Sequence, residues 1–101
     1  METATKPCML LNVDDYLAET AKLSLKECGA IFLLMSAAWL HDGDLQDDDV
    51  RLQIISHLNK HDWKKSKARL RAFFYVSEQG TLRNLHVDST LQHAQMSAMT
   101  N

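Results

Sequence analysis

The sequence predicts a small α+β domain that is mainly helical. Three observations support this class: a long segment with apolar residues at helical spacing, two shorter helical segments joined by a tight turn, and two strand-like runs around a glycine. The chain has 101 residues, of which 46% are hydrophobic and 24% charged, as suits one domain with one core. We therefore expect a single domain over residues 1–101, with its core between residues 8 and 94.

The N-terminal segment from Met9 to Leu17 predicts a short strand or an extended segment, followed by a turn at Asp14 and Asp15. The residues before it include an early acid and one Lys, with only a short apolar patch, so they do not resemble a signal peptide. No apolar run in the chain approaches the roughly 18 residues that a membrane span needs. We therefore expect a cytoplasmic protein without a membrane partner.

The longest periodic segment predicts a helix that begins after Ser24 and stops at Gly43. Ser24 and Glu27 form a capping box. Apolar residues recur at helical spacing behind this box: Leu25, Cys28, Ile31, Phe32, Met35, Ala38 and Trp39. Leu33 and Leu34 widen the apolar face, so we expect this helix to be buried on most sides.

Two short helices follow an acidic run, Asp42 to Asp49, which carries five acids. One of the last three acids begins the first short helix, because negative charge is favoured at a helix N-terminus. Asn59 ends that helix and caps the next one, with Asp62 three residues further on as in a variant of the capping box. Two short helices joined this closely, the second of them basic, are typical of a helix-turn-helix.

The second short helix lies within the segment from Asn59 to Phe74 and carries six of the eleven Lys and Arg residues. Placing successive residues about 100° apart gathers a narrow stripe on one side. The stripe consists of Trp63, Ser66, Leu70, Phe73 and Phe74. The bases spread over the remaining surface, so we expect an anchored helix with a basic outer face.

The segment from Phe73 to Val87 contains two strand-like runs, with Gly80 able to supply the positive φ of a hairpin turn. A hairpin directly after the second short helix is the wing of a winged helix. Weak helical spacing through Leu91 and Ala94 predicts a short C-terminal helix. The full prediction is a winged helix-turn-helix with three helices, a short N-terminal strand, a C-terminal β-hairpin wing and a short C-terminal helix.

Several strings of the chain also resemble a known family in their order and spacing. They are LNVDDYLAET, LSLKECGAIFLLMSAAW, DGDLQDDDVRL, Trp63 on the basic helix, Phe73 with Phe74, and Val87 with Asp88. Together they resemble a phage and prophage domain of unknown function, found alone or at the N-terminus of phage replication proteins, and the resemblance covers about Pro7 to Ala94. The family is similar in layout to the winged-helix N-terminal domains of phage replisome organisers. The resemblance implies a phage-derived protein in a DNA transaction within a bacterial host cell.

The chain departs from that family at two places. The family usually closes its hairpin with a His-Lys-Arg-hydrophobic-Asp run, where this chain has residues 84–88, NLHVD. The family has Gly-Gly-hydrophobic-Pro turns before the acids, where this chain has residues 42–46, DGDLQ. Both departures make the surface less basic than the family pattern.

DNA binding is the first functional hypothesis, because the bases cluster on one helix with polar groups at its N-terminus, where a recognition helix meets base edges. The candidate residues are Asn59, Lys60, His61, Lys64, Lys65, Lys67, Arg69, Arg71 and, on the hairpin, Arg83. If about five of these bases touched phosphates, affinity would fall by roughly two to three decades between 50 and 200 mM salt. The acidic run would oppose binding if it lay on the same face.

The alternative hypothesis is a protein-interaction module that binds and modulates a host or phage complex. Segregated charge and a hairpin with Leu82 and Leu85 would suit a protein partner. The amphipathic C-terminal tail also offers a surface for a homodimer.

The sequence predicts neither an enzyme nor a cofactor or metal site. Cys8 and Cys28 match no zinc spacing and are expected to be small buried apolar groups. His57 and His61 straddle a predicted helix break, and the acidic run lacks the glycine and terminal Glu of a calcium loop. No serine lies in a nucleophile elbow, and no glycine-rich phosphate loop exists.

Overall fold

The computed structural model describes residue 9 and residues 11–100, with side chains up to residue 93. This part of the chain forms five helices and one two-stranded antiparallel sheet, which confirms a mainly helical α+β class. In chain order the elements are α1 (Val13–Thr20), α2 (Leu25–Leu40), α3 (Asp49–Ser56), α4 (Lys60–Arg71), β1 (Tyr75–Val76), β2 (Leu82–Arg83) and α5 (Leu85–Thr100). None of the described helices combines the length and the apolar character that crossing a membrane requires.

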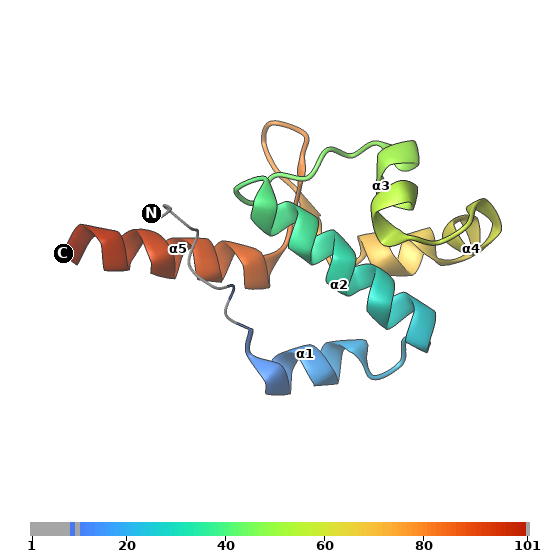
Figure 1. The fold of residues 1–101 in the computed structure, drawn as a ribbon, viewed down its shortest axis with the longest axis horizontal. Coiled ribbons are helices and arrows are strands. Elements are labelled where there is room, and N and C mark those ends of the chain that lie inside the picture. Colours follow the sequence, from blue (N-terminus) through green and yellow to red (C-terminus); the bar gives the residue numbers. More distant parts are fainter. Residues whose placement is uncertain (1–8, 10, 101) are drawn as a thin grey trace, which may run out of the picture.

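The long helix α2 runs through the middle of the molecule, and the other elements are arranged around it (Figure 1). Helices α3 and α4 pack on α2 and on each other, and α5 also contacts α2. Helix α1 lies below α2 in the view of Figure 1, while the C-terminal half of α5 projects away from the body.

The N-terminal segment is a helix where a short strand was expected, so that prediction is wrong for residues 13–17. Asn12 Oδ1 accepts a hydrogen bond from the backbone N–H of Asp15 at 3.1 Å and caps α1. Asp14 and Asp15 fall in the first turn, where they favour the helix through its dipole. The two acids expected to form a turn therefore begin a helix. Cys8 lies outside the described residues.

Helix α2 begins at the predicted capping box. The Ser24 hydroxyl accepts from the Glu27 N–H at 3.1 Å, and Glu27 Oε1 accepts from the Ser24 N–H at 3.0 Å. The helix ends at Leu40 with His41 as its C-cap, slightly before the predicted stop at Gly43, and Asp42 and Gly43 take positive φ values of 57° and 97° in the turn that follows. The expectation of burial on most sides is wrong along one side, because Leu25 is 90% exposed and Phe32 is 51% exposed. Cys28 is half-buried rather than buried.

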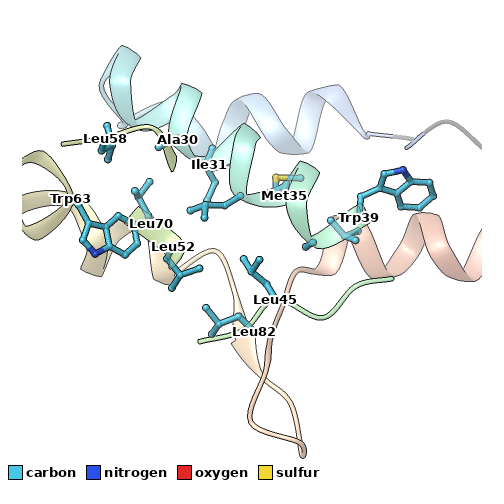
Figure 2. Close-up of a cluster of buried hydrophobic side chains, with 13 residues drawn as sticks. Ala30, Ile31, Met35, Trp39, Leu45, Leu52, Leu58, Trp63, Leu70 and Leu82 are labelled. Atoms are coloured by element: carbon cyan, nitrogen blue, oxygen red, sulfur yellow. The ribbon is translucent and has the colours of Figure 1, made fainter. Parts of the chain in front are cut away.

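The core gathers on the inner face of α2 (Figure 2). Ile31 and Met35 are fully buried there, and Leu52 of α3 and Leu70 of α4 pack into the same cluster. Further members come from the loops, the hairpin and α5: Leu45, Leu58, Trp63, Leu82 and Val87. The stripe predicted for α4 is confirmed for Trp63, Ser66 and Leu70, which are buried. Its last two members, Phe73 and Phe74, lie beyond the end of α4 and are partly buried against the core.

The predicted hairpin is present but short. Tyr75 pairs with Arg83 and Val76 with Leu82, while Gly80 takes a φ of +84° in the turn. Leu45 adds a third, isolated bridge to Leu82, with N–O distances of 2.9 and 2.7 Å. Leu82 is 3% exposed, so it belongs to the core and not to the outer surface of the hairpin.

The C-terminal helix is longer than expected, since α5 has 16 residues. Buried Asn84 sets its start: Asn84 Oδ1 accepts from the N–H groups of His86 at 2.9 Å and Val87 at 3.2 Å. Its Nδ2 donates to the carbonyl of Phe73 at 2.9 Å, which ties α5 to the segment after α4. The tail proposed for self-association is described only in part, because its side chains beyond residue 93 lie outside the described residues.

Replacing Asn84 by Ala should lower the free energy of unfolding by about 2 to 3 kcal/mol, because two helix amides and one carbonyl lose their buried partner. Asn84→Ser should lose less, since serine still caps a helix but is too short to reach Phe73. Urea denaturation followed by circular dichroism measures both. Equal losses of unfolding free energy in the Ala and Ser variants would contradict the role of Asn84 as the N-cap of α5.

Glu27 should make stability depend on pH. Its pKa lies below the usual value, chiefly because the Ser24 N–H donates to it, with smaller contributions from Ser66 and Arg69. Because the pKa of Glu27 is lower in the folded state than its value of about 4.3 in the unfolded chain, the carboxylate stabilises the folded state at pH values above that unfolded pKa. This stabilisation is lost as the pH falls from about 4.3 through the folded pKa. We expect the free energy of unfolding of the wild type to exceed that of Glu27→Gln by about 1 to 2 kcal/mol at pH 7. Near pH 3 the two proteins should be equally stable. A constant difference between pH 7 and pH 3 in urea titrations would contradict this assignment.

Candidate nucleic-acid interface

The predicted site centres on α4, whose orientation follows from its buried side. With Trp63, Ser66 and Leu70 facing the core, the helical repeat places the candidate bases on two flanks and on an outward crest. The two flanks and the crest have different electrostatic surroundings.

The flank beside α3 is neutralised by two acids of the acidic run. Arg71 forms a two-pronged ion pair with Asp47, in which Nη2 and Oδ2 are 2.9 Å apart, and Lys67 pairs with Asp49 at 3.3 Å. Asp49 Oδ1 also accepts from the Trp63 indole N–H at 3.0 Å, and this bond is the main cause that lowers the pKa of Asp49. Arg71 likewise lowers the pKa of Asp47. Both acids are therefore charged at neutral pH and cancel the bases beside them.

The flank beside α2 is neutralised as well. Arg69 Nε lies 3.3 Å from Oε2 of the buried Glu27. Asp62 Oδ2 accepts from Lys26 Nζ at 3.0 Å, so its carboxylate bridges α4 to α2. Asn59 Oδ1 accepts from the Asp62 N–H at 2.7 Å, which confirms Asn59 as the cap of α4 and commits its oxygen to that helix.

Four candidate residues remain on the outward side: Lys60, His61, Lys64 and Lys65, which we call the basic crest. All four are exposed. No carboxylate in the described part of the chain forms an ion pair with any of them. Exposed Ala68 follows on the same side of the helix, so no bulky group stands beside the crest there.

Arg83 is held apart from the other candidates, in the hairpin. Its guanidinium lies 2.8 Å from Asp44 Oδ1 and 2.8 Å from Asp88 Oδ1, and these contacts raise its pKa, Asp88 having the larger effect. Asp44 also accepts from the Thr81 hydroxyl at 2.7 Å. Because Arg83 is the only Lys or Arg between Tyr75 and Asn84, the hairpin presents no unpaired base.

The acidic run thus serves as a source of intramolecular partners. Asp44, Asp47 and Asp49 pair with candidate bases, and Asp48 Oδ1 caps α3 by accepting from the N–H groups of Val50 and Arg51. Among the described residues, no cluster of three or more His, Cys, Asp or Glu is placed to hold a metal ion. A cavity of about 720 Å³ opens between α1 and the start of α5, away from the crest.

A search of curated proteins found no match, and a search of solved structures found none either. Residues 7–92 match the model of a family described as "Protein of unknown function (DUF1376)". Since the match spans most of the sequence, this chain is a member of the DUF1376 family.

Proposed function

We propose that this chain is a phage-derived DNA-binding protein that acts in replication or its regulation, in the cytoplasm of a bacterial host. DNA would be held by the basic crest, with Lys60, Lys64 and Lys65 on phosphates and His61 toward base edges. The supporting observation is that these four residues face solvent and pair with no carboxylate of the described residues, whereas the bases on the two flanks are paired.

We also infer that the fold is a winged helix-turn-helix. Helices α3 and α4 would form the helix-turn-helix, since only residues 57–59 separate them, and β1 with β2 would form the wing. The isolated bridge between Leu45 and Leu82 supports this layout, because it extends the small sheet to the segment before α3. In this arrangement α4 is the recognition helix, and the crest lies in its N-terminal half, where such helices contact bases.

The phage and replication context rests on the resemblance of this sequence to the phage and prophage domain.

The hairpin, whose charge is neutralised, affects how DNA would be bound. A wing without an unpaired base contributes little to phosphate contact, so the crest would supply most of the electrostatic attraction.

A protein-interaction module that binds a host or phage complex is the second candidate. Its support is the exposed apolar surface near the neutral hairpin, where Val76 is 60% exposed and Leu85 is 72% exposed. Retention of a specific protein by the wild type, lost in the Val76→Glu variant, would favour this candidate over DNA binding.

The DNA proposal predicts a definite salt dependence. Three phosphate contacts give a log–log slope of about −2.7, so the dissociation constant for a duplex should rise roughly 40-fold between 50 and 200 mM salt. Lys64→Glu should weaken binding at least about tenfold at 50 mM salt, because an attractive contact becomes repulsive. Fluorescence anisotropy with a labelled duplex measures both quantities.

Arg51→Glu is the matched control, because Arg51 is exposed and lacks an ion pair within the described chain. Arg51 lies beside a cavity between α3 and the hairpin and is not part of the crest. It changes the net charge by the same amount as Lys64→Glu and should leave affinity within about threefold. Equal losses in the two variants, or a binding curve that is flat with salt, would exclude the crest as the binding site.

A further inference from the structure

The outer face of α2 carries an apolar surface that the described residues leave exposed. Its residues lie along one side of the helix, and we call them the α2 stripe: Leu25, Gly29, Phe32, Leu33, Ser36 and Leu40. Leu25 is 90% exposed, Leu40 67% and Phe32 51%. The stripe runs the whole length of the 16-residue helix, about 24 Å at 1.5 Å per residue, and contains no charged residue.

Two small residues on the stripe, Gly29 and Ser36, have features that contacts within one copy of the chain do not explain. A Cβ added at Gly29 would meet nothing within 4 Å, so this helical glycine avoids no contact inside the molecule although glycine weakens a helix interior. The Ser36 hydroxyl donates to the carbonyl of Phe32 at 2.8 Å, so Ser36 can be covered by an apolar surface without losing a partner. Both features suit close approach of another helix.

The stripe is symmetric about the midpoint between Phe32 and Leu33. Reversing the helix about that point exchanges Leu25 with Leu40, Gly29 with Ser36, and Phe32 with Leu33. Each exchange matches large with large or small with small. A two-fold interface requires this kind of self-complementarity, because residue i of one copy contacts residue j of the other and the reverse also holds.

The charges at the ends of the stripe are complementary in the same antiparallel arrangement. Lys22 precedes the stripe and Asp42 follows it, and the two positions are nearly equidistant from the midpoint. Lys22 is exposed and forms no ion pair with any described carboxylate. Antiparallel pairing brings Lys22 of each copy close to Asp42 of the other, whereas parallel pairing would bring like charges together.

A groove beside the stripe could receive the second copy. It has a volume of about 380 Å³, lies between α2 and the turn from α3 to α4, and is lined in part by Leu25, Gly29, Leu33 and Leu58. In the antiparallel arrangement, Leu40 of the second copy lies opposite Leu25 of the first. It is therefore directed toward this groove.

We propose that two copies of this chain associate through their α2 stripes, as an antiparallel two-fold dimer. One helix face is at the small end of specific interfaces, so the dissociation constant should be on the order of 10 to 100 μM. This dimer does not depend on DNA binding, because the basic crest is not part of the interface.

Sedimentation equilibrium over concentrations from about 5 to 500 μM tests the proposal through a charge exchange. Leu25→Glu alone and Leu40→Lys alone should each weaken association at least about tenfold, because each places a charge against a leucine. The double variant L25E/L40K should regain association to within about threefold of wild type, since antiparallel pairing sets each new Glu against a new Lys. In a parallel dimer like charges would meet, and the double variant would be the weakest.

Val50→Glu is the matched control, because Val50 is 65% exposed on α3, away from the stripe. It should associate like wild type, and circular dichroism should show unchanged helix content in all variants. A wild type that stays monomeric at 500 μM, a double variant that does not recover, or a control that weakens association as much as Leu25→Glu would overturn the proposal.

Gly29 provides an independent check with opposite effects in one variant. Gly29→Ala should raise the melting temperature of dilute monomer by about 3 to 6 °C, because alanine favours the helix and its Cβ has free space. The same variant should weaken association severalfold, because the added methyl group separates the paired helices. A higher melting temperature with unchanged association would contradict the stripe as the interface.

Discussion

The placement of α4 against α2 and α3 determines the charge that this molecule presents. Trp63 anchors the helix in the core, and its indole N–H donates to Asp49 at the start of α3. On the opposite flank, Arg69 meets the buried carboxylate of Glu27 in α2. Because both sides of α4 are engaged, the helix cannot rotate about its axis without breaking contacts. The basic crest is thus the face that remains outward.

The ion pairs on the flanks matter more for charge than for stability. Exposed pairs such as Lys67 with Asp49 contribute little to folding, because water and salt screen the attraction between the two charges. Their larger effect is to cancel the positive charge of Lys67 and Arg71, and Arg83 is cancelled in the same way by Asp44 and Asp88. Within the described part of the chain, the basic crest then stands out as a compact cluster of unpaired bases, on a protein whose formal net charge is −2. Such a surface would attract a polyanion to one face of the protein, although the protein as a whole has no excess of positive charge.

The local features were predictable from the sequence because their partners lie three residues apart. Ser24 with Glu27 and the cap at Asn59 are of this kind, and the hairpin turn at Gly80 follows from the φ that glycine allows. The N-terminal helix was missed, because an apolar run followed by two acids fits a strand and turn as well as a cap at Asn12.

Most of the electrostatics of the site could not be predicted in this way. Arg71 and Asp47 are 24 residues apart, and Arg83 and Asp44 are 39 apart, so their pairing depends on the tertiary fold. Periodicity also could not show which side of α2 would stay uncovered, since its apolar residues extend around most of the helix. The exposure of Leu25 became evident only once the neighbours of α2 were placed.

We propose that one outward face of α4 carries the DNA contact. Amide chemical shifts of the ¹⁵N-labelled chain, recorded while a duplex is added, test this claim most directly. If the basic crest binds the duplex, the largest shift changes should fall on residues 60–65, while the shifts of hairpin residues 75–83 should change little. Largest changes in the hairpin, or no changes at saturating DNA, would contradict this proposal.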